Sequence, residues 1–253
     1  MEKLISEWMR LYLTPHDALR ERLAAHLLGQ ESVAVQAHDG MTRVLVVPFD
    51  KQNDGTDRHW TALCELASIL QAQFGFPAPA VSVSGAEGYR LWLSLAAPVP
   101  VSEAQQFIEQ LHRAHGFGAA PGPGAAAGPH ALPPCLNARS GRWAAFINPG
   151  MGASFADEPG LEVAPPLAAQ AAFLEGLESI GLAQFRQALQ ALQPASLPAS
   201  LPASQSAQPA SRPVASGPAE GLLLRDATLE DIVRHLHAKN IEPTFRHLLP
   251  GSR

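Results

Sequence analysis

One proline-rich run near the C-terminus limits how much of this chain can fold. Residues 193–218 contain six Pro, six Ala and six Ser among 26 positions, and Arg212 is their single charged residue. Such a segment cannot bury enough apolar surface to offset the entropy lost on ordering, so we expect a disordered, extended linker. The linker divides the 253-residue chain into a domain over residues 1–192 and a short segment over 219–253.

The segment 219–253 carries one amphipathic pattern. Its apolar side chains at positions 229, 232, 233 and 236 share one face of a helix, and Thr228 can cap that helix. A segment of this length rarely folds alone. We therefore expect a short C-terminal helix that docks on the first domain or on a protein partner.

Residues 1–192 alternate between helical and strand patterns. The periodicity predicts helices over 1–13, 17–28, 57–74, 102–115 and 167–192, the last with a break at Gly181. It predicts strands over 32–37, 42–47, 80–84, 89–95 and 142–147. Paired strands with interspersed helices indicate an α+β fold, with helices packed on one face of a sheet. Residues 119–129, made of Ala, Pro and Gly alone, are typical of a mobile loop within this domain.

The charge and the cysteines exclude some functional classes. The net charge of −5 provides no general attraction for nucleic acid or anionic lipid, so binding of either needs a local basic patch. The two cysteines form no Cys-x-x-Cys pair, so no thiolate zinc site is indicated. The chain lacks a long charge-free apolar stretch, and its first residues are too charged for a signal peptide. We expect a cytoplasmic protein with no membrane partner.

Three segments carry candidate chemistry, and the first is the strand that ends at Asp50. A carboxylate at the end of a buried strand is a common ligand for Mg²⁺, and Asp54 follows as a weaker second ligand. The alternative is that Asp50 only caps the turn that Asn53, Asp54 and Gly55 favour.

The second segment, residues 84–95, reads SGAEGYRLWLSL. Ser84, Gly85 and Gly88 form a turn whose backbone N–H groups can bind an anion. Arg90 and Trp92 share a face of the next strand, where the arginine can bind phosphate and the indole can stack on a base. The alternative is an ordinary hairpin with Trp92 in the core and Arg90 at its edge.

The third segment places Arg139 and Arg142 on either side of a turn, next to Trp143 and Phe146. A basic turn with neighbouring aromatic side chains is able to contact nucleic acid. A solvent-facing hairpin tip explains the same residues equally well.

In this order, the three segments resemble the catalytic core of archaeo-eukaryotic primases, most closely the primase domain of TOTE conflict systems. The resemblance covers residues 16–180. It is carried by His26-Leu27-Leu28-Gly29, Pro48-Phe49-Asp50-Lys51, Ser84-Gly85-Ala86-Glu87-Gly88-Tyr89-Arg90-Leu91-Trp92, Pro98-Val99-Pro100, Leu132-Pro133 and the hairpin from Ser140 to Phe146. It implies an RRM-like antiparallel sheet with packed helices, and a primase/polymerase nucleotidyltransferase that holds two divalent metals, Mg²⁺ or Mn²⁺, on three acids.

The chain departs from this family at two positions that matter for catalysis. Pro48 replaces the first metal-binding carboxylate, and Arg90 replaces the histidine that contacts the nucleotide phosphates. Asp50 is the one motif acid that remains. We therefore expect a degenerate metal site and a phosphate site formed by Lys51, Ser84, Gly85, Gly88 and Arg90, with a nucleoside triphosphate or single-stranded nucleic acid as the ligand.

Two alternatives remain open. In one, the protein is an active enzyme that holds Mg²⁺ or Mn²⁺ on relocated acids such as Asp54, Asp57 or Asp157. In the other, it is a non-catalytic protein-interaction adaptor, in which the fold serves as a scaffold and the C-terminal helix recruits a partner.

Overall fold

A computed structural model describes residues 1–14, 19–51, 58–118, 120–122 and 124–193. The predicted linker from Pro194 onward, the predicted C-terminal helix and the candidate ligand Asp54 lie outside the described residues. The elements follow in the order α1 (Glu2–Leu11), α2 (Leu19–Leu27), β1 (Ala34–Val35), β2 (Met41–Asp50), α3 (Arg58–Phe74), β3 (Ala80–Val83), β4 (Gly88–Pro100), α4 (Val101–His115), β5 (His130–Ala131), β6 (Cys135–Leu136), β7 (Trp143–Ile147), a 3₁₀ helix η1 (Pro149–Phe155), α5 (Leu167–Glu175) and α6 (Leu182–Leu192).

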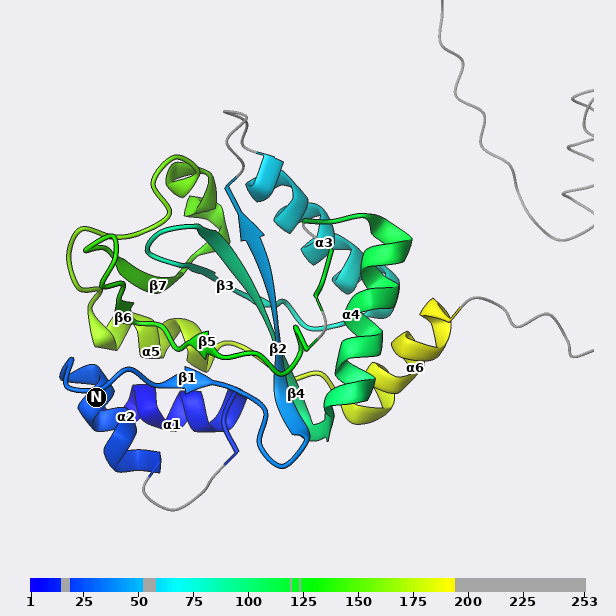
Figure 1. The fold of residues 1–253 in the computed structure, drawn as a ribbon, viewed down its shortest axis with the longest axis horizontal. Helices are drawn as coiled ribbons and strands as arrows, with labels where there is room; N and C mark the ends of the chain where they lie inside the picture. Colours follow the sequence, from blue (N-terminus) through cyan, green and yellow to red (C-terminus); the bar gives the residue numbers. More distant parts are fainter. Residues whose placement is uncertain (15–18, 52–57, 119, 123, 194–253) are drawn as a thin grey trace, which may run out of the picture. The chain divides into compact units, whose positions relative to one another are not determined.

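Five strands form the central sheet in the order β2-β4-β3-β7-β6, and every neighbouring pair is antiparallel (Figure 1). The predicted hairpin of β3 and β4 is present, with Val83 opposite Tyr89 and Ala80 opposite Trp92. A second sheet pairs β1 with β5. The architecture is therefore a mixed α+β fold built on antiparallel sheets.

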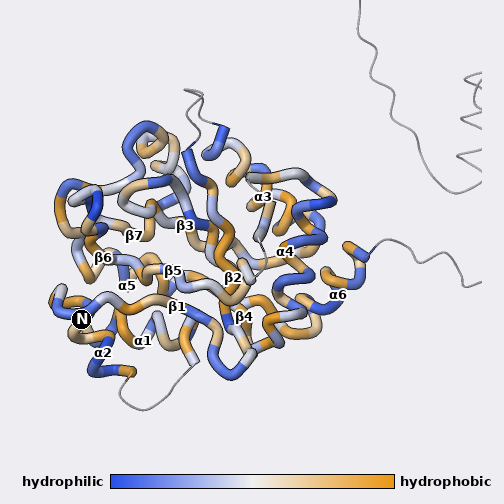
Figure 2. Tube along the Cα trace, in the orientation of Figure 1, coloured by the Kyte–Doolittle hydropathy of each residue, from blue (hydrophilic) through white to orange (hydrophobic). Residues whose placement is uncertain are grey.

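Helices cover both faces of the sheet, so the prediction of helices on one face is wrong. Along β2, Leu45 and Val47 pack into one core with α3, α4 and α6, while Val44 and Val46 pack into another with α1, α2 and α5. Successive side chains of a strand point to opposite faces, and here both sets are apolar (Figure 2). A strand that is apolar on both faces needs cover on both.

The predicted strand pair 32–37 and 42–47 does not form a hairpin. The tight turn is present, because the N–H and C=O groups of His38 and Met41 bond to each other. Beyond the turn, however, β1 pairs with β5, and β2 pairs with β4 on both sides of a register shift at Arg43. The turn residues correctly predicted where the chain reverses direction. The two strands that flank the turn, however, pair with strands distant in the sequence and not with each other.

Residues 167–192 form two helices, as the break predicted at Gly181 requires. Residues 176–181 separate α5 from α6, and Ile180 forms a parallel bridge with Leu95 of β4. In the described part of the chain, no helix combines the length and the apolar character that a membrane crossing demands.

His26, the histidine of the first family pattern, has a structural role in this fold. Its side chain is buried, its Nδ1 accepts a hydrogen bond from the N–H of Val33 at 3.1 Å, and its Nε2 lies 2.9 Å from the carbonyl of Leu132. An Nδ1 that accepts leaves Nε2 as the donor, so the neutral ring joins α2 to the segments before β1 and after β5.

Candidate functional site

The candidate residues of the first two segments meet where β2 ends and β4 begins. In the antiparallel register, Pro48 lies opposite Arg90 and Asp50 lies opposite Gly88. Pro48 lies on β2, which is an edge strand of the sheet. An edge strand tolerates proline, because the missing N–H does not remove a hydrogen bond to a neighbouring strand. Pro48, Asp50 and Arg90 share one face because their positions alternate along paired strands.

Arg90 is held by two carboxylates. Its Nη1 lies 2.5 Å from Oδ1 of Asp50, and its Nη2 lies 3.0 Å from Oε2 of Glu87. Nη1 also donates to the carbonyl of Tyr89 at 2.9 Å, and the side chain is only 16% exposed. The strand register thus brings Asp50 and Arg90 together as an ion pair. Sequence analysis did not single out Glu87, because it occupies a variable position of the glycine motif.

The glycine turn uses its backbone donors within the protein. The hydroxyl of Ser84 accepts hydrogen bonds from the N–H groups of residues 86–88, at 3.3, 2.8 and 3.0 Å. The N–H of Gly85 donates to the carbonyl of Pro159 at 2.8 Å. The expectation that Ser84, Gly85 and Gly88 present backbone donors to a phosphate is therefore not met in this structure, because a short side chain and a loop carbonyl bond those donors first.

The two glycines of the motif are required by close packing. A Cβ on Gly88 would lie 2.1 Å from the carbonyl oxygen of Phe49 on the paired strand. Gly85 has a φ of +80°, and a Cβ there would lie 2.9 Å from the carbonyl oxygen of Arg142. The motif thus brings the turn against β2 on one side and against the hairpin of β6 and β7 on the other.

The other predicted cations are also paired with carboxylates. Lys51 Nζ lies 3.0 Å from the carbonyl oxygen and 3.4 Å from Oδ1 of Asp157. Arg142 lies 2.9 Å from Glu158. Arg139, largely exposed, lies 3.8 Å from Glu87.

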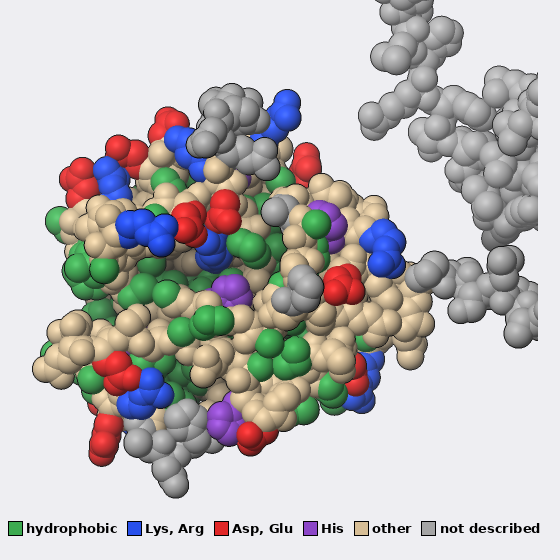
Figure 3. Space-filling model, viewed as in Figure 1, with side chains coloured by type: hydrophobic (Ala, Val, Ile, Leu, Met, Phe, Trp, Pro, Cys, Tyr) green, Lys and Arg blue, Asp and Glu red, His purple; other side chains and the backbone are tan. Residues whose placement is uncertain are grey.

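These pairs balance the charge of the region. On the face drawn in Figure 3, described basic and acidic side chains lie next to one another and do not separate into a basic patch. The local patch that nucleic-acid binding would need is therefore matched by its own carboxylates in this structure.

Trp92 lies in the core. It is 1% exposed, and its Nε1 donates to the hydroxyl of Ser82 at 2.8 Å. It packs against Tyr12 and Phe146, at centroid distances of 5.3 and 5.6 Å. The predicted stacking of this indole on a base is therefore not possible in this conformation, and the alternative of a core tryptophan describes its position.

His130 is a further residue of this region that the sequence patterns did not single out. Its Nε2 is buried and has no hydrogen-bond partner among the described residues. Burial lowers the pKa of His130, the nearby charge of Arg90 lowers it further, and a hydrogen bond with the backbone of Ala125 opposes both effects. A partly buried ring near a positive charge has its protonated form disfavoured. Its position two residues before Leu132 of the Leu132-Pro133 pattern is the signal that could have identified it.

The described residues do not fit a pair of divalent metals. Pro48 has no ligand atom in its side chain, and the Asp50 carboxylate binds the Arg90 guanidinium. Asp157 lies next to Lys51, and the described residues contain no group of three or more His, Cys, Asp or Glu able to hold a metal ion. A two-metal centre needs several carboxylates around each site, and the described residues do not supply them.

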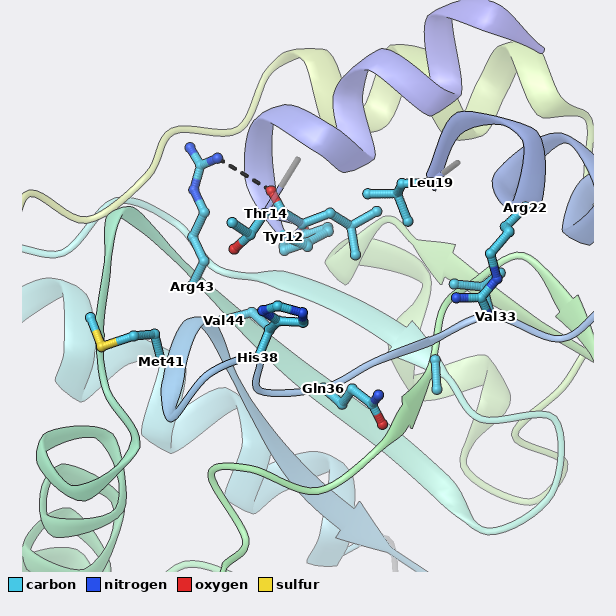
Figure 4. A pocket seen from close by; sticks show the side chains of 12 residues that line it. Tyr12, Thr14, Leu19, Arg22, Val33, Gln36, His38, Met41, Arg43 and Val44 are labelled. Atoms are coloured by element: carbon cyan, nitrogen blue, oxygen red, sulfur yellow. Dashed lines mark hydrogen bonds between the residues drawn. The ribbon is translucent and has the colours of Figure 1, made fainter. Parts of the chain in front are cut away.

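A separate pocket of about 80 Å³ lies between α1, α2 and the start of β2 (Figure 4). Arg22 on its rim pairs with Glu31, and the guanidinium of Arg43 donates to the carbonyls of Leu13 and Leu95 at 3.5 and 3.1 Å. An apolar cavity that holds one benzene measures about 150 Å³. This pocket is smaller and its cations are engaged, so it does not offer a nucleotide site.

Comparisons with known proteins add little. No family model matches the chain, and no curated protein matches it. Among solved structures, the chain is similar to the AEP domain of the primase-polymerase (PrimPol) of cyanophage S-2L, with 16% sequence identity and a TM-score of 0.33. The match covers 64% of this chain and 78% of that chain. A likeness of this degree does not establish a common fold or a common activity.

Proposed function

We propose that this chain is a primase-like protein of the archaeo-eukaryotic primase superfamily, of the TOTE type, that binds a nucleotide or nucleic acid without a working two-metal centre. The observation that carries the proposal is the pairing of Pro48 with Arg90 across β2 and β4. It puts an arginine beside Asp50, at the position where the resemblance implies contact with nucleotide phosphates.

The chemistry of arginine supports phosphate binding at this position. A guanidinium presents several N–H donors in a planar fork that matches phosphate oxygens, and it remains charged at neutral pH. Such a fork needs no metal ion to hold an anion. The Asp50 carboxylate, which the family would use for metal, instead lies against Arg90.

The first test is catalytic. With Mg²⁺ or Mn²⁺, we expect the purified chain to show little or no primer synthesis on a single-stranded template. Robust incorporation that Asp50→Ala abolishes would contradict the proposal and would favour relocated acids, among them Asp157 or residues of the segment 52–57.

The second test is binding, with the change in fluorescence anisotropy of a labelled nucleoside triphosphate and of a labelled single strand. We expect Arg90→Ala to weaken binding by about 1.5–3 kcal/mol, the value of a charged hydrogen bond. The matched control is Arg186→Ala, because Arg186 is also ion-paired, with Glu103 at 3.3 Å, but lies on α6. Equal losses for both variants, or no binding of either probe at low salt, would leave a protein-interaction adaptor as the better explanation.

A further inference from the structure

We infer that Asp50 and Glu87 act as intramolecular competitors of phosphate for Arg90, so that the site opens by breaking an ion pair and binds phosphate without a divalent metal. The inference rests on the proposed function. It adds a mechanism that controls access of phosphate to Arg90, which the proposed function does not include.

The geometry of Arg90 is the first reason. A phosphate held by the fork needs two N–H donors on one edge of the guanidinium. Both terminal nitrogens are engaged, Nη1 by Asp50 at 2.5 Å and Nη2 by Glu87 at 3.0 Å. Because Nη1 also donates to the carbonyl of Tyr89, both of its N–H groups are in use, and a phosphate that approaches the edge between Nη1 and Nη2 has to displace a carboxylate.

The difference in exposure shows which side chains can move. The side chains of Asp50 and Glu87 are 53% and 54% exposed, whereas Arg90 is largely buried and also donates to the carbonyl of Tyr89. A half-exposed carboxylate regains its hydration when it swings into water, and exposed ion pairs are weak. The carboxylates are therefore the mobile partners, and the guanidinium stays in place to receive the anion.

The described cations next to Arg90 are also paired with carboxylates. Lys51, Arg139 and Arg142 are each within 4 Å of a carboxylate oxygen, on Asp157, Glu87 and Glu158. Glu87 links two of the cations, because its Oε1 lies 3.8 Å from Arg139 and its Oε2 lies 3.0 Å from Arg90. Removal of the charge of Glu87 therefore weakens the pairing of both Arg90 and Arg139, while removal of the charge of Asp50 weakens the pairing of Arg90 alone.

The test uses the full chain in the presence of EDTA, with two probes that carry the same phosphate chemistry. One is a fluorescently labelled adenosine triphosphate, and the other is a short labelled single strand without terminal phosphates. The variants are Asp50→Asn and Glu87→Gln. The control is Glu103→Gln, which breaks the Arg186 pair and changes the net charge by the same single unit.

We expect Asp50→Asn and Glu87→Gln each to bind at least one probe roughly two- to fivefold more tightly than the parent chain, the upper part of the range for a partly exposed ion pair. Glu103→Gln should change binding by less than about twofold. Circular dichroism of each variant verifies that the fold is retained. A stronger response with the triphosphate would identify a nucleotide as the source of the phosphate, and a stronger response with the single strand would identify a phosphodiester.

The outcomes separate this inference from the proposed function. If the parent chain binds and both carboxylate variants bind equally or more weakly, the competitor role is wrong and phosphate binding stands. If the parent chain binds only after EDTA is replaced by Mg²⁺, and Asp50→Asn loses that binding, Asp50 is a metal ligand and the inference is overturned. If neither the parent chain nor any variant binds either probe, the proposed function fails and the inference fails with it.

Discussion

Gln170 is expected to be a main determinant of stability, because it completes the edge of the sheet. It lies on α5, is 6% exposed, and makes two hydrogen bonds to one residue of β7. The N–H of Phe146 donates to its Oε1, and its Nε2 donates to the carbonyl of Phe146, both at 2.9 Å. The side-chain amide thus replaces a neighbouring strand.

The reason for this substitute lies in β6. The register of β6 and β7 pairs Cys135 with Ala144, so one strand continued backward would bring Pro133 opposite Phe146. Proline has no N–H and cannot supply the ladder donor. The ladder ends at Cys135, and the two backbone groups of Phe146 depend on Gln170.

The magnitude follows from these two bonds. Leaving a buried backbone donor or acceptor without a partner costs about 1–3 kcal/mol per group. With partial rescue by a water molecule in the vacated space, Gln170→Ala should lower the free energy of unfolding by about 2–4 kcal/mol. For a domain of this size, that corresponds to a fall in Tm of about 4–16 °C. Gln170→Glu should also destabilise, since a carboxylate cannot donate to the Phe146 carbonyl.

Urea denaturation followed by circular dichroism and tryptophan fluorescence measures the effect, with an unchanged slope against urea as evidence of the same transition. The matched control is Gln106→Ala, an exposed glutamine on α4. A Gln170→Ala variant within about 0.5 kcal/mol of that control would refute the reasoning, because it would mean that the Phe146 backbone does not depend on the amide.

The remaining predictions test the packing, the titration and the domain limits. Gly88→Ala should destabilise the domain by about 1–3 kcal/mol, measured by thermal denaturation, because the new Cβ would lie 2.1 Å from the Phe49 carbonyl; an unchanged Tm would contradict the close approach. Because burial and Arg90 lower the pKa of His130, the unfolded chain takes up a proton on this residue before the folded chain does, and stability should fall as the pH drops below the ordinary value of 6.5. Urea titrations at about pH 7 and pH 5 should show a smaller acid loss for His130→Gln than for the parent chain, and equal losses would refute the assignment. Limited proteolysis should cut within residues 193–218 and leave a stable core, and resistance there at protease levels that nick other loops would show that this segment is packed.

The sequence predicted the local elements better than their partners. The turn at residues 38–41, the hairpin of β3 and β4 and the break between α5 and α6 depend on glycines and on apolar periods that act over a few residues. The pairing of β1 with β5 and of β2 with β4 does not, because it joins segments separated by about 40 to 100 residues. Apolar residues at both odd and even positions of β2 indicated a strand buried on both faces. The expected hairpins instead favoured a sheet covered by helices on one face.

The candidate site shows the same division. Types and spacing of residues were sufficient to select Asp50, the glycine turn and Arg90, and to show that Pro48 removes a carboxylate from the motif. The tertiary structure decided what these residues do to one another. The antiparallel register places Arg90 next to Asp50. The N–H groups of the turn donate to the hydroxyl of Ser84. The alternation of side chains along β4 places Trp92 in the core. The sequence shows which charged groups and hydrogen-bond donors are present. Whether such a group is free to bind a ligand depends on the partners within hydrogen-bond distance. Those partners come together only when strands distant in the sequence pair.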